Sequence, residues 1–281
     1  MSEVYLNGEF VSLAEACVPV MDRGFLFGDG VYELIPVYGG HPFRLLQHME
    51  RLDNSLRSIR MENPLQPDAW ERIIARLTGS TSEVDQLLYL QVTRGVDWTR
   101  NHLFPQAVEP TVFVMAWTAG PRDPDIADKG LAAVVLEDNR WHRCNIKATA
   151  LLGNVLLRQV AQDAGAAEAI LVRDGLVTEG SSTNPFVVRD GEILTPPANN
   201  CLLRGITRDL VLELARGANM PCAERHITRN ELETADELWI SSSSREVQPV
   251  TLLDGEPVGE GVPGALWRRM DGLFQDYKAH L

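Results

Sequence analysis

Lys147 is a lysine whose amine could act as a nucleophile, in the segment Asn-Ile-Lys-Ala-Thr at residues 145–149. Most lysines are simply solvated, because the side chain is seldom buried without a partner. A catalytic role would require the amine to attack an aldehyde, and desolvation or a neighbouring cation would favour that attack by lowering the pKa of the amine. Taken alone, the residue leaves both interpretations open.

Glu179 lies in a second polar segment, which reads Thr-Glu-Gly-Ser-Ser-Thr-Asn at residues 178–184 and follows a predicted strand. Such a composition is typical of a polar turn. The functional interpretation is a carboxylate at a strand end that holds a protonated ring nitrogen. This is one way in which a protein tunes pyridoxal 5'-phosphate as an electron sink.

Two further segments have the composition of an anion-binding site. Residues 203–208, Leu-Arg-Gly-Ile-Thr-Arg, stand where a helix is predicted to begin. Free backbone N–H groups and the positive end of the helix dipole attract a phosphate at such a position. Residues 241–244 are four serines after a predicted strand, and their hydroxyls could donate to the same anion. The alternatives are an ordinary helix start and a polar loop.

Three basic side chains could also bind anions. Arg51 is predicted on the polar side of a helix, where exposure is the usual outcome. If it is buried instead, it could bind a phosphate through two parallel hydrogen bonds. Arg100 and His102 stand two residues apart in a predicted loop and could converge on a carboxylate. The alternative for this pair is plain exposure to solvent.

Local patterns predict the elements that would position these residues. Four Asn-Gly or Asp-Gly pairs separate apolar runs, as in two-residue hairpin loops, at residues 7–8, 174–175, 190–191 and 254–255. Runs rich in Val, Leu and aromatic residues predict strands at 87–92, 111–117, 131–136, 169–172 and 237–240. Apolar positions that recur every three or four residues predict helices from Phe43 to Ile59 and at 151–164, 207–215 and 265–277.

A Pro- and Gly-rich break at residues 118–124 predicts a domain boundary near residue 120. Since 281 residues suit one large or two ordinary domains, we expect two α/β domains, residues 1–120 and 121–281. The apolar runs are all too short to cross a membrane, and the N-terminus lacks the pattern of a signal peptide. We therefore expect a cytoplasmic protein.

The charge and cysteine content exclude several classes of protein. The formal net charge of −13 argues against a nucleic-acid partner, because phosphate neutralisation requires clustered Lys and Arg. The four cysteines form no CxxC pair and no cluster with histidine at zinc-ligand spacing. We expect them to be reduced packing residues, and we expect no metal site.

Five ordered stretches, spread over nearly the whole chain, resemble the class IV aminotransferases that depend on pyridoxal phosphate. This is the branched-chain and D-amino-acid group, and the chain is most similar to its D-amino-acid transaminases. The stretches are residues 22–33 (DRGFLFGDGVYE), 91–95 (QVTRG), 143–147 (RCNIK), 177–182 (VTEGSS) with Asn184, and 197–200 (PANN) with 205–209 (GITRD).

The resemblance implies a role for each matching residue. Lys147 matches the lysine that holds the cofactor covalently, and Glu179 matches the acid that faces the pyridine nitrogen; these two are the expected catalytic residues. Tyr32, Arg100 and His102 match the group that binds the α-carboxylate of the substrate. The cofactor-binding set is Arg51, Lys147, Glu179, Ser181, Leu203, Ile206, Thr207, Ser242 and Ser243.

The resemblance also implies a fold and an activity. The fold is the two-domain fold type IV, with a small N-terminal α/β domain and a larger cofactor-binding C-terminal domain that contains a barrel-like sheet. The activity is transfer of an amino group between a D-amino acid, such as D-alanine or D-glutamate, and pyruvate or 2-oxoglutarate, in a ping-pong sequence. Because Arg100 and His102 match residues of the neighbouring subunit, the resemblance implies a homodimer.

Several alternatives share this scaffold. A branched-chain L-amino-acid aminotransferase should lack the Arg-x-His pair, whereas an aminodeoxychorismate lyase would need no keto acid. An (R)-amine transaminase is a third alternative, because the segment at residues 95–100 is one residue longer than the family pattern and contains Trp98. A non-catalytic protein that binds pyridoxal phosphate on the same scaffold is the remote alternative.

Overall fold

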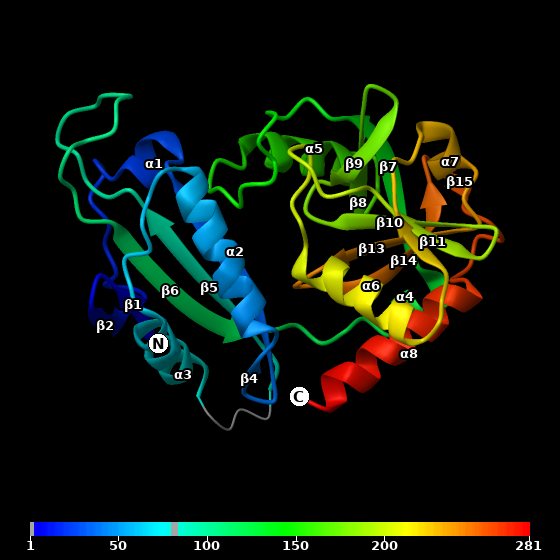
Figure 1. Cartoon of the computed structure of the whole chain (residues 1–281), viewed down its shortest axis with the longest axis horizontal. Helices are drawn as coiled ribbons and strands as arrows, with labels where there is room; N and C mark the ends of the chain where they lie inside the picture. The colour runs from blue at the N-terminus through cyan, green and yellow to red at the C-terminus, as the bar shows by residue number, and fades with distance from the viewer. Residues whose placement is uncertain (1–2, 80–83) are drawn as a thin grey trace. The chain divides into compact units, whose positions relative to one another are not determined.

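The computed structural model describes residues 3–79 and 84–281 (Figure 1). By backbone contacts the chain forms two compact units. Unit 1 comprises Met1–Gly120 with Ile146–Leu151, and unit 2 comprises Pro121–Asn145 with Leu152–Leu281. Ile146–Leu151 thus belongs to unit 1, although the sequence placed it in the C-terminal domain. The division into functional domains at residue 120 stays a prediction.

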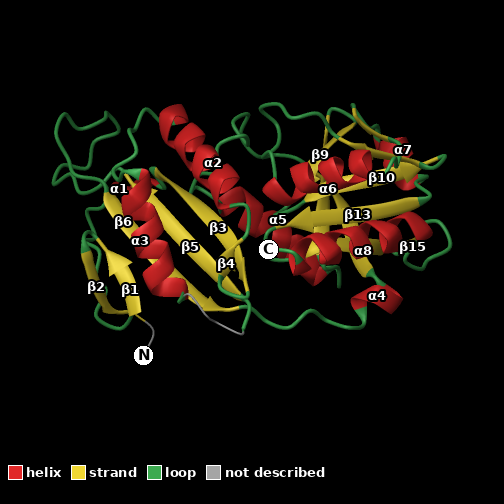
Figure 2. Cartoon of the chain, turned by 60° about the horizontal axis from the view of Figure 1, so that its bottom comes forward, coloured by secondary structure: helices red, strands yellow, loops and turns green. Residues whose placement is uncertain are grey.

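Unit 1 is a six-stranded antiparallel sheet in the order β2-β1-β6-β5-β3-β4, with helices packed on it (Figure 2). Residues of α2 and α3 share one apolar core with the sheet. The strands are β1 Glu3–Leu6, β2 Glu9–Ser12, β3 Gly30–Tyr38, β4 His41–Pro42, β5 Gln86–Thr93 and β6 Thr111–Thr118. The helices are α1 Arg23–Phe27, α2 Leu45–Ser58 and α3 Pro67–Thr78.

The side chains of β3 explain why unit 1 contains buried charge. Successive residues of a strand point to opposite faces, so Val31, Glu33 and Ile35 lie on one face. All three are fully buried. Glu33 is therefore a carboxylate within an apolar core, and such a group needs partners that compensate for the loss of water.

Unit 2 contains a nine-stranded mixed sheet in the order β12-β11-β10-β13-β14-β7-β8-β9, with β15 paired to β14. The sheet curls, because β9 at one end of this order also contacts β10. The strands are β7 Leu131–Glu137, β8 Glu168–Arg173, β9 Leu176–Gly180, β10 Asn184–Arg189, β11 Glu192–Thr195, β12 Cys222–Glu224, β13 Glu237–Ser242, β14 Glu246–Leu253 and β15 Glu256–Pro257. The helices are α4 Ile126–Lys129, α5 Leu152–Asp163, α6 Ile206–Gly217, α7 Arg229–Glu233 and α8 Ala265–Ala279.

The four predicted hairpin loops are confirmed. Each joins two antiparallel strands, and both of its residues have positive φ, as in Asp174 (53°) and Gly175 (77°). The predicted strands and the four predicted helices are also present, with ends that differ by a few residues. The sequence patterns predict neither the strand β3 nor the helix α3.

None of the described helices is both long and apolar enough to cross a membrane. All four cysteines are free thiols, and Cys144 is the buried one.

Candidate active site

Lys147 is held beside β3 in unit 1 by its own backbone. Its carbonyl accepts a hydrogen bond from the N–H of Tyr32 (3.0 Å), and its N–H donates to Oγ of Ser55 (3.3 Å). The next residue, Ala148, forms a β-bridge with Val31. These bonds fix the backbone at Lys147 and place its Nζ 4.3 Å from the centre of the Tyr32 ring. The amine therefore lies over an aromatic face at the edge of the sheet.

Arg51 is nearly buried rather than solvent-facing. Its Nε and Nη2 donate to the two carboxylate oxygens of Glu33 at 2.8 and 2.7 Å. His48, one turn earlier on α2, contacts Oε2 of Glu33 through Nδ1 at 2.7 Å. This arrangement locks the guanidinium in one orientation, because a bidentate pair is geometrically specific. The sequence predicts a phosphate at Arg51, and it does not single out Glu33 or His48 as partners of this arginine.

The charges of this buried cluster are set by its members. Burial alone would raise the pKa of Glu33, but Arg51 and His48 lower it to about 2. Burial lowers the pKa of His48, and its Nε2 is a buried atom without a partner. Glu33 is therefore ionised and His48 neutral near pH 7, which means that Nδ1 of His48 donates the hydrogen bond. The cluster carries one carboxylate and one guanidinium.

Glu179 is buried at the end of β9 in unit 2, with both carboxylate oxygens bonded. Nη1 of Arg140 donates to Oε1 at 2.5 Å, and the backbone N–H of Leu203 donates to Oε2 at 2.8 Å. Arg140 is in turn bonded by Nε and Nη2 to both oxygens of Asp138, at 2.9 and 3.0 Å. Thr178 donates its hydroxyl to Asp138 at 2.8 Å. The acid thus belongs to a network that sequence reasoning missed.

Burial raises the pKa of Glu179 to about 7, although Arg140 and the Leu203 N–H act in the opposite direction. Removing a carboxylate from water disfavours its charged form, which explains the direction. A second positive group beside Glu179 would restore the ionised form. The site is therefore suited to a cationic ring nitrogen, since such a nitrogen would supply that positive charge.

The start of α6 is connected to Glu179 through Leu203, whose backbone N–H donates to the Glu179 carboxylate. Its N-cap residue is Gly205, which provides no side-chain cap for the first N–H groups. Ile206 and Thr207, the first two helical residues, are buried. Uncapped N–H groups at the positive end of a helix dipole bind anions, and α6 has 12 residues. Ile206 and Thr207 thus lie at a helix start, and Leu203 lies just before it, as the sequence predicts.

Asn184 connects this helix start to the serine segment. Its Nδ2 donates to the Leu203 carbonyl at 2.9 Å, and a Cβ on Gly205 would clash with its Oδ1. Asn184 is also the direct cross-strand partner of Ser241 on β13, whose buried Oγ has no partner. Ser242 ends β13, and Ser243 is in the turn that follows. A Gly at 205 therefore allows the helix start to lie close to the first residue of β10, which pairs with Ser241 near the end of β13.

Ser181 forms its hydrogen bonds with Glu168. Its side chain is buried, and its hydroxyl and backbone N–H both donate to Oε1 of Glu168. Asn154 donates to the Ser181 carbonyl at 2.8 Å. The predicted cofactor contact of Ser181 would therefore have to be made alongside its bond to Glu168.

The three residues predicted to bind a carboxylate form two groups within unit 1. Tyr32 lies with Lys147 and, at 5.6 Å between ring centres, with Tyr89. Arg100 and His102 are exposed, and both lie against the ring of Phe27. Arg100 and His102 thus share a contact with Phe27, whereas Tyr32 contacts Lys147.

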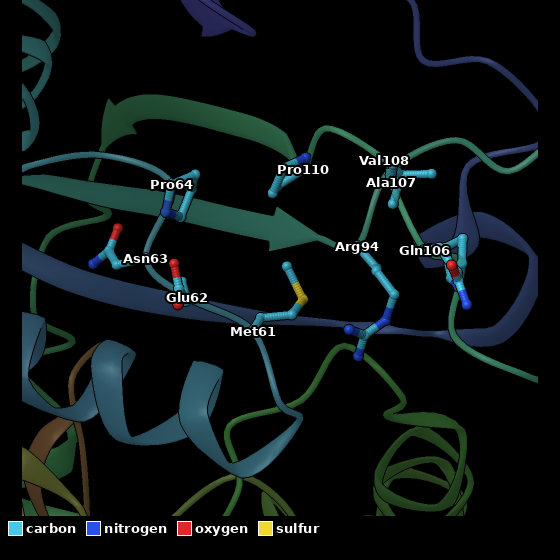
Figure 3. Close-up of a pocket in the computed structure, with 10 residues that line it drawn as sticks. Met61, Glu62, Asn63, Pro64, Arg94, Gln106, Ala107, Val108 and Pro110 are labelled. Atoms are coloured by element: carbon cyan, nitrogen blue, oxygen red, sulfur yellow. The ribbon is translucent and has the colours of Figure 1, made fainter.

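Unit 1 also contains a pocket of about 340 Å³ that is separate from these residues (Figure 3). It is lined by Met61, Glu62, Asn63, Pro64, Arg94, Pro105, Gln106, Ala107, Val108 and Pro110. Within residues 3–79 and 84–281, no group of three or more His, Cys, Asp or Glu side chains is placed to hold a metal ion.

Local sequence signals for the missed residues are weak. Glu33 is the one charged residue in an otherwise apolar run at residues 31–37, and an acid within a buried strand predicts a basic partner. Arg140 and Asp138 stand between two predicted segments and carry no periodic signal. Only the fold brings them to Glu179.

Comparisons with known proteins agree with this geometry. Residues 30–253 match the family model described as amino-transferase class IV. The chain is 42% identical over 279 residues to a D-alanine aminotransferase of Staphylococcus aureus, covering 99% of this chain and 98% of the relative. It is 39% identical over 275 residues to the D-alanine aminotransferase of Bacillus licheniformis, covering 98% and 96%.

Solved structures show the same fold. The branched-chain amino acid aminotransferase of Escherichia coli superposes with a TM-score of 0.90 at 27% identity, covering 98% of this chain and 94% of that one. The T.th. branched-chain enzyme, solved with pyridoxamine 5'-phosphate, gives a TM-score of 0.89 at 28% identity, covering 99% and 94%. The expected mixed α/β fold type IV is confirmed. The chain therefore belongs to the amino-transferase class IV family and is an enzyme.

Proposed function

We propose that the enzyme is a D-amino-acid transaminase that uses pyridoxal 5'-phosphate. It would exchange an amino group between a D-amino acid, such as D-alanine or D-glutamate, and a 2-oxo acid, pyruvate or 2-oxoglutarate. The relatives with 39–42% identity are D-alanine aminotransferases over nearly their whole length, which supports this substrate class. The observation that carries the proposal is the hydrogen bond from Leu203 to buried Glu179, because Leu203 stands three residues before Ile206, the first residue of α6.

This arrangement fits a molecule with a cationic ring nitrogen at one end and a phosphate at the other. Glu179 would accept the hydrogen bond of the ring nitrogen, since each carboxylate oxygen has two lone pairs and, among the described residues, receives one donor. Ile206 and Thr207 would bind the phosphate through backbone N–H groups, with hydroxyls from Thr207, Ser242 and Ser243. Leu203 would lie beside the ring, and Ser181 would support the site through Glu168.

We also propose Arg51 of unit 1 as a phosphate ligand, as the family resemblance implies. Its pairing with Glu33 through Nε and Nη2 fixes the plane of the guanidinium. Because the guanidinium is planar and always charged, its orientation by Glu33 would make it a defined ligand.

When bound, the cofactor supplies an electron sink for the carbanion formed at the substrate Cα. Lys147 would hold the cofactor, and its amine would act as the general base and then the general acid that moves the proton of the substrate Cα. Glu179 would keep the ring nitrogen protonated. The bonds that fix the Lys147 backbone would limit where its amine can reach, and this would determine which face of the substrate it protonates.

Tyr32, Arg100 and His102 would bind the substrate carboxylate. The family pattern places the Arg and His in the active site of a neighbouring subunit, so we propose a homodimer. A cytoplasmic location likewise remains a prediction.

The test is the absorbance of the purified enzyme with pyridoxal phosphate, mixed separately with D-alanine, L-alanine, L-leucine and an (R)-amine. We expect D-alanine alone to convert the yellow enzyme to its pyridoxamine form, and 2-oxoglutarate to reverse the change. Lys147→Ala should abolish turnover. The matched control is Lys129→Ala, an exposed lysine on α4 that should leave the rate unchanged.

The alternative is a branched-chain L-amino-acid aminotransferase, which the two solved structures favour. Conversion by L-leucine and not by D-alanine would establish that activity. It would keep the assignments of Lys147 and Glu179 and overturn those of Arg100 and His102.

A further inference from the structure

The loop between β5 and β6 has to be positioned by side chains. Residues 94–110 contain neither a helix nor a strand, and they include Arg100 and His102. A loop of this length without its own secondary structure is usually functional, and its conformation depends on contacts with neighbouring elements. Its apolar side chains Trp98 and Leu103 are exposed, so they do not anchor it.

Helix α1 is attached to both ends of this loop through Asp22. Asp22 caps α1 by accepting from the N–H of Gly24 at 2.7 Å. The same carboxylate accepts hydroxyl hydrogen bonds from Thr93, the last residue of β5, and Thr111, the first residue of β6, at 3.0 and 2.6 Å. A β-bridge also joins Asp22 to Val96. Helix α1 is therefore bonded to the two strand ends between which the loop runs.

Arg23 connects α1 to the middle of the loop. Its Nη1 donates to the carbonyl of Asn101, between Arg100 and His102, at 2.6 Å. Its Nε donates to Asp29 at 2.8 Å, and Asp29 is also bonded by Arg94. Arg23 is 3% exposed, so this bond is shielded from water.

Phe27 lies beneath both predicted carboxylate-binding side chains. The guanidinium carbon of Arg100 is 5.0 Å from the centre of the Phe27 ring, and the His102 ring centre is 5.2 Å away. Arg23 also contacts this ring, at 4.8 Å. An aromatic face attracts a guanidinium electrostatically and supports a second ring by stacking. One ring thus sets the positions of two otherwise exposed side chains.

We propose that Phe27 and Arg23 are positioning residues that determine how Arg100 and His102 meet the substrate carboxylate. The inference rests on the proposed function, in which Arg100 and His102 bind that group. The loop alone does not fix the positions of Arg100 and His102. The Phe27 ring and the Arg23 bond hold both side chains in the positions in which they would bind the carboxylate. Without them, binding a carboxylate would have to order the loop first, which weakens binding.

The test is Phe27→Leu, which keeps apolar bulk and removes the aromatic face. Since two ring contacts are lost, we expect the KM for D-alanine and the inhibition constant of propionate each to rise about three- to tenfold. The kcat at saturating D-alanine should stay within about twofold, because the change affects binding rather than the chemical step. Phe25→Leu is the matched control on the same helix, since Phe25 is 75% exposed and should change neither constant.

Further variants separate positioning from a general structural role. Phe27→Tyr restores the ring and should restore both constants. Arg23→Lys keeps the positive charge, but its single amine cannot reproduce the guanidinium's two separate bonds, to Asp29 and to the Asn101 carbonyl. It should therefore raise the KM in the same way, and it tests the proposal if Phe27→Leu does not fold. In a background that carries both Arg100→Ala and His102→Ala, Phe27→Leu should add little further effect, because both side chains through which the ring acts are absent.

The outcomes distinguish this inference from the proposed function. If Arg100→Ala raises both constants while Phe27→Leu and Arg23→Lys leave them unchanged, positioning by α1 is overturned and the proposed function stands. If the wild-type enzyme does not act on D-amino acids, or if Arg100→Ala has no effect, the proposed function fails as well. Equal loss of kcat, cofactor affinity and melting temperature in Phe27→Leu would show a structural role and contradict the proposal.

Discussion

Nη1 of Arg140 lies 2.5 Å from Oε1 of Glu179, so the buried acid of unit 2 already has a cationic partner within the chain. Arg140 is shared, because Asp138 takes two of its other N–H groups. The guanidinium therefore compensates Glu179 only in part, and burial remains the larger influence on its pKa. A ring cation at Glu179 would complete a site that is short of positive charge.

This balance predicts a pH dependence for the cofactor-free enzyme. The pKa of Glu179 is about 7 in the folded state against an ordinary 4.5. Below pH 4.5 Glu179 is protonated in both the folded and the unfolded state, so its titration does not reduce the free energy of unfolding. As pH rises from 4.5 to 7 the unfolded state ionises first, so the free energy of unfolding should fall by up to about 3 kcal/mol. Urea unfolding between pH 5 and 8 measures this.

Glu179→Gln is the comparison for that experiment, because glutamine does not titrate. The difference in unfolding free energy between wild type and variant should change across this pH range, with the variant gaining relative stability as pH rises. A difference that stays constant from pH 5 to 8 would show that the acid ionises normally in the folded chain. Added pyridoxal phosphate should reduce the effect in the wild type, if its ring nitrogen neutralises Glu179.

Glu33 should show the opposite sign. Its pKa is about 2 in the folded state, below its ordinary 4.5, so the ionised form stabilises the fold above pH 4.5. That contribution, up to about 3 kcal/mol, should be lost as pH falls from 4.5 towards 2. Glu33→Gln should remove this acid sensitivity and should cost about 3–5 kcal/mol at pH 7, since Arg51 loses its buried partner.

Glu62→Gln is the matched control, because Glu62 is an exposed acid of the same unit. It should change neither the stability at pH 7 nor its acid dependence. An unfolding free energy of Glu33→Gln equal to that of Glu62→Gln would contradict a structural role for the Glu33–Arg51 pair.

Gly205→Ala tests the close approach at the start of α6. The new methyl group would clash with Oδ1 of Asn184, so Asn184 or the helix start must shift. We expect a loss of about 1–3 kcal/mol in unfolding free energy, as for other overpacked sites. We also expect weaker binding of inorganic phosphate and of pyridoxal phosphate, measured by titration calorimetry.

The control is Gly217→Ala at the other end of the same helix, where an added methyl group meets no atom within 4 Å. It should leave phosphate binding unchanged and should be neutral or slightly stabilising, because alanine favours the helix. If Gly205→Ala binds phosphate as the wild type does, the start of α6 is not the phosphate site.

The local elements followed from short-range patterns. Each Asn-Gly or Asp-Gly pair requires two positive φ values, and this conformational demand acts within two residues. The apolar repeat from Leu45 to Ile59 likewise identified α2. In contrast, β3 was missed because its one charged residue, Glu33, lies on the buried face with Val31 and Ile35, so apolar and polar residues do not alternate along the strand.

The amino-acid sequence by itself determined the family and most of the local elements, and it predicts Lys147 and Glu179 as the catalytic residues, since all of these depend on motifs of a few residues. Only the tertiary structure decided that Arg51 pairs with Glu33, that Arg140 pairs with Glu179 and that residues 146–151 join unit 1. The physical reason is distance along the chain. A salt bridge or a β-bridge between residues far apart in the chain is set by how sheets and helices pack, and no local pattern encodes that packing.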